Sequence, residues 1–397
     1  MTGATWDSDK SIMSDFKFHK MKKFILIAAS AAVLLTVNSC QKNGLDTKLI
    51  TEEEPGETVD VSFCLENLDS SVSTKATDAS LESSIKSVQI FVFRKGGTQD
   101  GKVDNAVYVP LSSAASGTYH LSPFKCTVGT REAWAIVNAP EDYTQSVTTL
   151  AELKAKTVTL SQNADSGGQK LVMVGNVMTD AGGQVVTGFT AGTMTVRMKV
   201  SRLVAGVRLA KVVNKMQVPS LQGSLSITGA YLMNVPGKQR LDGTLLASKA
   251  DDISDDEWYA KNKKASGGDP LALLVQSAGT PVAVPFGDTG IAPEYLFYSM
   301  PTDIGGPVDD KTMRVESYGD KFRTSTYLVV EAKVGDMACV YPVLLPAMEA
   351  NKKYSVSLTI NHIGGDPAKP WEKIKFADID AVVDVGAWTD VPYSEVI

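Results

Sequence analysis

The chain has 397 residues and an ordinary globular composition, with 43% hydrophobic and 21% charged residues. This composition excludes wholesale disorder. The formal net charge of −6 at pH 7 argues against a nucleic-acid partner, because binding to a phosphate backbone needs a positive face. The four cysteines lie far apart and form no CxxC pair, which argues against a structural zinc site.

Residues 21–39 have the order of an export signal. Lys22 and Lys23 form a basic start, and the apolar run over residues 24–37 is too short for a good membrane span. A small residue and then Cys40 follow directly, an arrangement that resembles the lipobox of bacterial lipoproteins. The resemblance implies that the Cys40 thiol carries a diacylglycerol and that cleavage makes Cys40 the mature N-terminus.

Two polar segments flank this signal. Residues 1–20 show no apolar periodicity and precede a complete signal, so we interpret them as a non-native extension and Met21 as the translation start. Residues 40–58 are polar and acidic, with Pro and Gly, and we interpret them as a tether between the lipid and the folded body.

The folded body is predicted to begin with a strand at 59–66. Val59, Val61, Phe63 and Leu65 alternate with less apolar residues, which is typical of a half-buried strand. Residues 69–80 are small and polar, and predict an exposed loop.

Short strands continue through the rest of the chain. Residues 87–93 are apolar on both faces, which indicates a central sandwich strand. Thr149 and Glu152 fit a capping box and predict a short helix. Further strands are predicted at 132–137, 171–174, 193–199, 204–213, 224–234, 327–332, 354–360 and 379–385.

This pattern predicts an all-β fold with one or two short helices. The body is too long for one sandwich core, so we expect two sandwiches in tandem, at 59–198 and 199–397.

No catalytic motif is present. GxGxxG, P-loop, HExxH and GxSxG patterns are absent, so the sequence predicts no enzyme activity and no cofactor, although a glycosidase-type carboxylate pair stays open. The acidic run at 251–257 lacks the EF-hand spacing, which favours a solvated loop over a calcium site.

Cysteine and aromatic residues leave alternatives open. Cys64, Cys126 and Cys339 lie in apolar strand-like runs, which favours buried free thiols over one disulfide and one free thiol. Four aromatic residues could form an exposed set that binds glycan, and these are Trp258, Tyr259, Trp371 and Trp388. Core packing is the simpler role for them.

The order of these features resembles the fimbrillin family, the FimA-like subunits of type V pili of Bacteroidia. Each motif is weak alone, but the ordered series runs along nearly the whole chain after the signal. The series is Cys40, the strand VDVSFCLEN, Lys75-Ala76, IKSVQIFVFRKG, Cys126 to Arg131 leading into AWAIVNAP, Arg202-x-x-Ala205, ANKKYSVSLTI and Trp388.

The resemblance implies a fold and an assembly pathway. Fimbrillins are exported to the outer membrane as lipoproteins and fold as two tandem transthyretin-like Greek-key sandwiches. At the surface a trypsin-like protease cuts the loop after the first strand, here between Lys75 and Ala76. The cut removes the strand that carries Val59, Val61, Phe63 and Leu65 and so opens a groove.

A donor strand of another subunit then fills this groove, and the subunits polymerise into a cell-surface fimbrium. In this chain the donor would be 388–397, with Val391 and Tyr393 facing the groove. Implied partners are further copies of the chain and related anchor and tip subunits. The best-known members are cut after Arg rather than Lys, so a Lys-tolerant protease and no cut at all both stay open.

The sequence therefore predicts a structural stalk subunit of an adhesive pilus. Within the family, the alternatives are an uncut anchor and a tip adhesin. Outside it, they are a monomeric surface lipoprotein that binds glycan or host protein, and an exported hydrolase on a β-sandwich.

Overall fold

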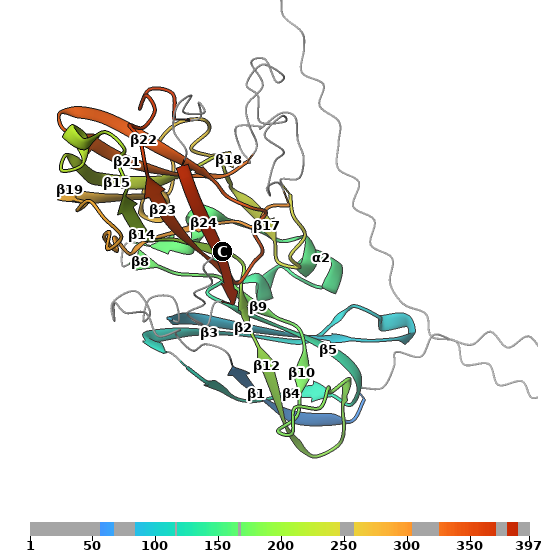
Figure 1. Ribbon diagram of the computed structural model, residues 1–397. Helices are drawn as coiled ribbons and strands as arrows, with labels where there is room; N and C mark the ends of the chain where they lie inside the picture. Colours follow the sequence, from blue (N-terminus) through green and yellow to red (C-terminus); the bar gives the residue numbers. More distant parts are fainter. Residues whose placement is uncertain are drawn as a thin grey trace, which may run out of the picture. The chain divides into compact units, whose positions relative to one another are not determined.

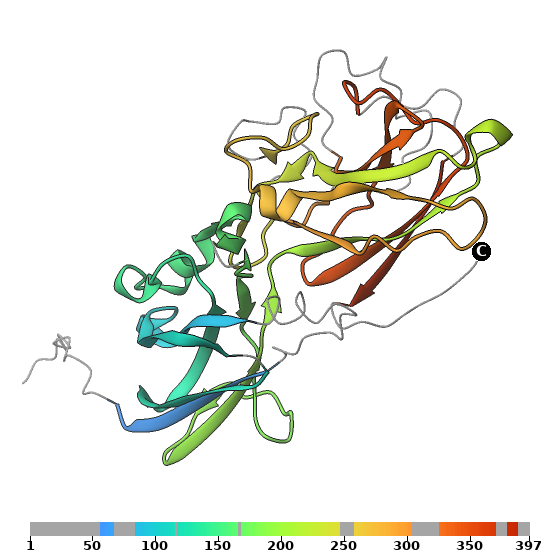
Figure 2. The same ribbon diagram turned by 90° about the vertical axis from the view of Figure 1, so that its left-hand side faces the viewer.

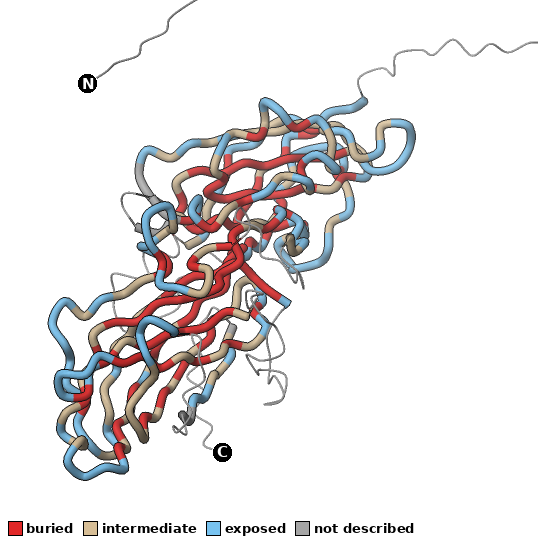
Figure 3. Tube along the Cα trace, turned by 90° about the horizontal axis from the view of Figure 1, so that it is seen from above, coloured by how far each residue is buried: buried red, intermediate tan, exposed pale blue. Residues whose placement is uncertain are grey.

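The computed structural model describes residues 56–66, 84–115, 117–165, 168–246, 258–303, 325–370 and 379–387 (Figure 1). Within these ranges the chain is mostly β-strand and forms two sandwiches. The all-β expectation with one or two short helices is confirmed. Buried residues follow the strands, whereas exposed residues concentrate in the connections (Figure 3).

The first sandwich consists of two sheets. Sheet A has the strand order β10-β12-β1-β4, and sheet B has the order β13-β9-β5-β2-β3, with β11 paired to β5. The strands of sheet A are β1 (Thr58–Glu66), β4 (Tyr119–Thr127), β10 (Met178–Thr179) and β12 (Thr193–Lys199). Those of sheet B are β2 (Ile85–Arg94), β3 (Val103–Ala115), β5 (Gly129–Val137), β9 (Met173–Gly175), β11 (Gly188–Phe189) and β13 (Ser201–Arg202).

Strand β1 occupies an interior position in sheet A, with β4 on one side and β12 on the other (Figures 1 and 2). It pairs antiparallel with β4 and parallel with β12. The β1–β4 register shifts between Val61 and Phe63, where β4 carries an extra residue next to Pro123. A proline has no N–H for the ladder, so a β-bulge is a position where it is tolerated.

Sheet B is covered on both faces, as residues 87–93 predicted. Val88, Ile90 and Val92 of β2 face the core shared with β1. Phe91 and Phe93, which point to the other face, belong to a second cluster that extends into the second sandwich. Alternate side chains of a strand point to opposite faces, so a doubly covered strand must be apolar throughout.

The second sandwich repeats the strand arrangement of the first. Sheet C has the order β20-β14-β23-β24, and sheet D has the order β19-β15-β21-β22. The first strand, β14, again lies between an antiparallel neighbour, β20, and a parallel neighbour, β23. Sheet C consists of β14 (Ala205–Asn214), β20 (Tyr295–Ser299), β23 (Lys352–Ile360) and β24 (Ile379–Ala387). Sheet D consists of β15 (Leu225–Met233), β19 (Val275–Ala283), β21 (Tyr327–Val334) and β22 (Met337–Leu344).

Short elements complete the described fold. Helix α2 (Leu150–Ala155) begins with the expected capping box, since Glu152 N donates to Thr149 Oγ1 at 3.2 Å and Thr149 N donates to Glu152 Oε2 at 3.1 Å. The second helix is α3 (Leu271–Leu274). The remaining strands pair as β6 (Thr157–Thr159) with β17 (Lys238–Arg240), β7 (Ala164–Asp165) with β8 (Gly168–Gln169), and β16 (Val235–Pro236) with β18 (Trp258–Tyr259). The 3-10 helices are η1 (Gly97–Gln99), η2 (Tyr143–Gln145), η3 (Leu160–Asn163) and η4 (Pro219–Leu221).

The chain passes from one sandwich to the next within a few residues. Strand β13 still pairs with β9 of sheet B, and β14 is the first strand of the second sandwich. Leu203 N donates to Val172 O at 3.0 Å at this crossing. The β6–β17 pairing links the two sandwiches a second time.

We expect Phe63→Ala to lower the free energy of unfolding of the first sandwich by about 3–5 kcal/mol, because it leaves a cavity in the core. Asp60→Asn on the outward face of β1 is the control, and its surface ion pair with Lys125 predicts a loss of about 0–1 kcal/mol. Urea unfolding followed by circular dichroism measures both. Equal effects of the two variants would contradict the placement of Phe63 in the core.

Candidate functional site

The inward face of β1 closes the core of the first sandwich. Val61, Phe63 and Leu65 have no exposed surface, and Val59 is 2% exposed. All four side chains pack in one cluster with residues of sheet B and of the two neighbouring strands. Since β1 lies inside its sheet, its backbone and its side chains together fill a slot between β4 and β12.

Phe63 has the most specific surroundings of the four. Its ring stacks on Phe124 of β4, with 5.4 Å between ring centroids. The ring of Phe189, from β11, meets it edge-on at 6.4 Å. Such aromatic pairs stabilise beyond the area they bury, so this position accommodates a large flat side chain.

The outward face of β1 is tied to β12 by polar contacts. Glu66 Oε1 accepts a hydrogen bond from Arg197 Nη1 at 2.6 Å. The hydroxyls of Ser62 and Thr195 lie 2.9 Å apart within hydrogen-bonding distance. These contacts are part-buried or exposed, so they contribute less than the core packing.

No disulfide ties β1 to the rest of the described chain. Cys64, Cys126 and Cys339 are all free and buried, as expected. Cys64 Sγ lies 4.0 Å from His120 Nε2 on the outward side of sheet A. Chain continuity beyond Glu66 is therefore the covalent link between β1 and the sandwich it completes.

Cys126 lies on the wall of the slot that β1 fills. It is the register partner of Val59 and belongs to the same core cluster. Burial raises the pKa of the Cys126 thiol to about 12, with a smaller raising effect from Asp104. The thiol is therefore protonated and unreactive while β1 is in place.

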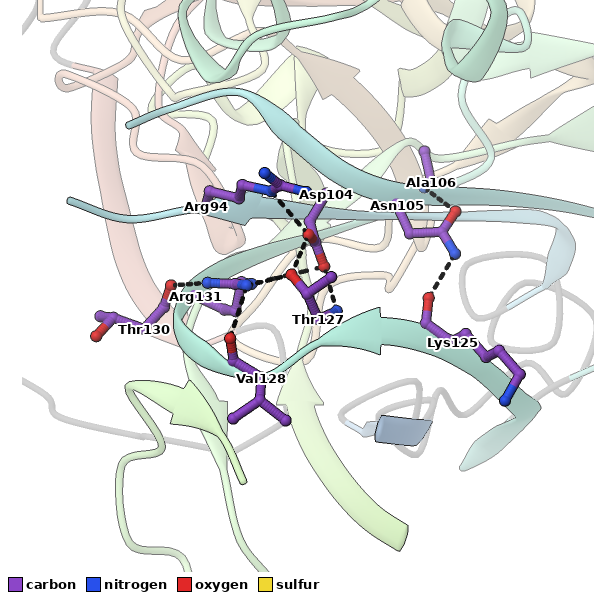
Figure 4. Close-up of polar contacts among 9 residues, drawn as sticks. All are labelled: Arg94, Asp104, Asn105, Ala106, Lys125, Thr127, Val128, Thr130 and Arg131. Atoms are coloured by element: carbon purple, nitrogen blue, oxygen red, sulfur yellow. Dashed lines mark hydrogen bonds and ion pairs between the residues drawn. The ribbon is translucent and has the colours of Figure 1, made fainter. Parts of the chain in front are cut away.

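A buried polar cluster lies at the end of the slot where β1 begins (Figure 4). Its centre is the carboxylate of Asp104, whose side chain has no exposed surface. The backbone N–H of Thr127 donates to Asp104 Oδ2 at 2.7 Å, and the Thr127 hydroxyl donates to Oδ1. Arg94 Nε donates to Oδ1 at 2.9 Å, and Arg131 Nε lies 3.5 Å from Oδ2.

A β-bulge explains why Asp104 points into this cluster. Phe93 pairs with Val103 and Val92 pairs with Asn105, so Asp104 is the extra residue of β3. A bulge re-aims the side chain of the inserted residue. The sequence predicted neither the cluster nor strands β3 and β4. The Cys126–Arg131 stretch belongs to the family resemblance, but nothing in the sequence pairs it with Asp104.

The surroundings of Asp104 shift its pKa in opposite directions. Burial raises its pKa, but the hydrogen bonds from Thr127 and Arg94 and the charge of Arg131 lower it by more. The net result is a pKa below the ordinary value of 3.8. A pocket of about 390 Å³ adjoins the cluster and is lined by residues that include Gly56, Arg94 and Arg131.

Several sequence-predicted residues lie outside the described residues. These are Cys40, Lys75, Ala76, Val391, Tyr393, the acidic run at 251–257, Trp371 and Trp388. Trp258 is buried at 3% exposure, so it does not belong to an exposed aromatic platform.

In the described part of the chain, no group of three or more acidic, His or Cys residues is arranged to hold a metal ion. No helix in that part has the length and apolarity that a membrane crossing requires.

Residues 58–214 match the sequence model of the family described as major fimbrial subunit protein (FimA). The match runs from the first residue of β1 to the last residue of β14, and so contains the whole first sandwich. This region of the chain is similar to the FimA family. The match supports a pilus-related adhesion role and a place in a cell-surface fimbrium.

Solved structures share the fold at low sequence identity. A fimbrilin (FimA) from Porphyromonas gingivalis W83 superimposes with a TM-score of 0.53 at 15% identity, covering 84% of this chain and 99% of the other. A candidate cell adhesion protein from Parabacteroides distasonis gives 0.54 at 14% identity, with 84% and 99% covered. One from Bacteroides eggerthii gives 0.51 at 19% identity, with 84% and 97% covered. No curated protein has a significant sequence match to the chain.

The lowered pKa of Asp104 predicts an acid-sensitive contribution to stability. A depressed carboxylate stabilises the fold above its unfolded pKa, and this stabilisation is lost as the pH falls through the folded pKa. We therefore expect the difference in unfolding free energy between the wild type and Asp104→Asn to be largest near neutral pH and to shrink from about pH 4 downward. Urea unfolding at a series of pH values measures it. A pH-independent difference would show that the Asp104 charge does not contribute.

Proposed function

We propose that this protein is a pilus stalk subunit that polymerises by strand exchange after proteolysis removes β1. One observation carries the proposal: β1 is an interior strand of sheet A with four buried apolar side chains and no disulfide to the remainder. A single cut after β1 would turn it into a non-covalent ligand of the sandwich.

Loss of β1 would expose an apolar slot and unpaired backbone groups, and a replacement strand would cover both. Each of its four inward side chains contributes roughly 1.5–3 kcal/mol by burial. Without β1, β4 and β12 would both expose unpaired backbone groups to solvent. An added strand satisfies the backbone groups and the apolar slot together, which is the basis of β-augmentation.

The donor in this proposal is the segment 388–397 of a second copy, with Val391 and Tyr393 entering the slot. Because donor and slot are different surfaces of one chain, the contact is heterologous and builds an open fibre. The cut lies between Lys75 and Ala76 in the loop 69–80, and the enzyme is a trypsin-like surface protease that accepts Lys. A lipid on Cys40 holds the uncut subunit at the outer membrane, and the cut releases it.

An uncut anchor and a monomeric binder of glycan or host protein would both retain β1, so the fate of β1 at the cell surface separates the stalk proposal from these two. A tip adhesin need not donate a strand, so deletion of residues 388–397, which should abolish growth of a stalk, separates the stalk proposal from a tip.

Replacing the cleavage residue tests the proposal directly. We expect Lys75→Ala to give folded, full-length protein that forms no fibres, whereas wild-type fibres contain chains beginning at Ala76. Electron microscopy of sheared surface protein and N-terminal sequencing measure the two results.

The matched control is Lys95→Ala, which removes an exposed lysine of the described fold and should leave assembly unchanged. Fibres of normal length from Lys75→Ala, still carrying residues 59–66, would overturn the proposal.

The labelling rate of the Cys126 thiol measures whether the slot is filled or open. Because β1 covers this thiol, we expect maleimide labelling of Cys126 to be slow in the uncut chain and at least about tenfold faster in the cut monomer that has lost β1. Polymerisation should protect the thiol again. Mass spectrometry of the peptide that contains Cys126 gives the labelling rate.

Cys339 is the internal control, because it is buried in the second sandwich and is not covered by β1. Its labelling should stay slow in all three states. Equal labelling of Cys126 in uncut and cut monomers would contradict the opening of a slot at this position.

A further inference from the structure

Strand β4 depends on β1 for its place in sheet A. The strand order β10-β12-β1-β4 leaves β4 with β1 as its sheet partner, whereas β12 also pairs with β10. Removal of β1 would take away the whole ladder from Thr58–Thr127 to Leu65–Tyr119. The hydrogen bond from Val128 N to Glu57 O, at 2.7 Å, would go with it. An empty slot therefore needs something else to keep β4 as its wall.

Polar bonds between β4 and β3 supply such a link. Thr127, the last residue of β4, donates twice to Asp104. Two residues earlier, the carbonyl of Lys125 accepts from Asn105 Nδ2 at 2.6 Å. Asp104 and Asn105 both belong to β3, in sheet B, so these bonds join the C-terminal end of β4 to the opposite sheet (Figure 4).

Two arginines complete the cluster from the same sheet. Arg131 of β5 donates to Val128 O at 2.9 Å and to the Thr127 hydroxyl. Arg94, at the end of β2, donates to Asp104. None of these hydrogen-bond partners belongs to β1, so the bonds of the cluster would persist after β1 has left.

Burial strengthens the link at its centre. The Asp104 side chain is fully buried, and the Arg131 side chain is 9% exposed. A buried carboxylate that loses its donors keeps the cost of desolvation without compensation, so the cluster resists coming apart. The cluster therefore joins sheet B, which keeps its own strands, to the end of β4, which would lose its partner in sheet A.

We propose that the Asp104 cluster, consisting of Asp104, Asn105, Thr127, Arg131 and Arg94, is a positioning site that holds β4 in place while β1 is absent. The proposal rests on the strand-exchange function. Its consequence is that the slot keeps the width of one strand between cleavage and filling, so that a donor meets a preformed wall. When the slot is filled, both the β1–β4 ladder and the cluster fix β4 in place. When the slot is empty, the ladder is gone, so the cluster matters most for strand entry.

The test separates strand entry from strand loss. The full chain carries a site-specific protease sequence within 69–80; it is cut, and the β1 fragment is removed in mild denaturant. A fluorescent peptide with the sequence of residues 57–66 is then added after dilution, and fluorescence anisotropy gives its association and dissociation rates. This peptide probes the slot without assuming which segment is the natural donor.

Asp104→Asn should slow association by about tenfold or more, because the loss of a charge-assisted buried bond leaves β4 poorly placed. The dissociation rate should change less. A merely structural role would instead speed dissociation and leave association unchanged. Glu294→Gln, which removes the partner of Arg208 in the second sandwich, is the matched control and should alter neither rate.

Thr127→Val provides a second, nearly isosteric variant that removes the hydroxyl donor and should slow association in the same direction. Normal association rates in both cluster variants would overturn the positioning site while leaving strand exchange intact. Uncut variants that both fail to fold, judged by circular dichroism, would also overturn it, because the cluster would then serve the complete fold. If the peptide never binds the cut wild-type protein, the strand-exchange proposal fails as well.

Discussion

Four apolar side chains of β1 close the core of the first sandwich, and nothing covalent in the described fold fastens them there. The strand lies inside its sheet, so backbone pairing and side-chain burial coincide at one place. Sheet B does not depend on β1 in the same way, because its opposite face packs into the cluster shared with the second sandwich. The molecule therefore combines a supported sheet with a sheet that is complete only while one strand occupies its interior.

The second sandwich shows why this dependence is special to the first. Strand β14 occupies the place of β1, with the same parallel and antiparallel neighbours and equally buried side chains at Val207 and Leu209. However, β14 joins the first sandwich at one end and continues into the second at the other. A single cut next to β14 would leave it attached. A single cut after β1 would separate it from both sandwiches. The same position in the topology is therefore held by an exchangeable strand in the first sandwich and by a permanently attached strand in the second.

Polar and apolar contacts have different tasks around β1. The apolar slot, with the aromatic position around Phe63, provides affinity for a strand because burial is roughly proportional to area. The Asp104 cluster contributes geometry, because hydrogen bonds to a buried carboxylate are directional. Its pairing also holds the pKa of Asp104 below the ordinary value.

The sequence by itself determined the elements whose cause is local. Alternation revealed the inward face of β1, a continuous apolar run revealed the doubly covered β2, and the Thr149–Glu152 spacing revealed the capped helix, because each pattern follows the period of one element. Only the tertiary structure decided that β1 lies between β4 and β12, because pairing partners are set by contacts between distant segments. The Asp104 cluster was also decided only by the tertiary structure. A bulge in β3 points the carboxylate at a threonine 23 residues away, and no periodicity in the sequence records a bulge.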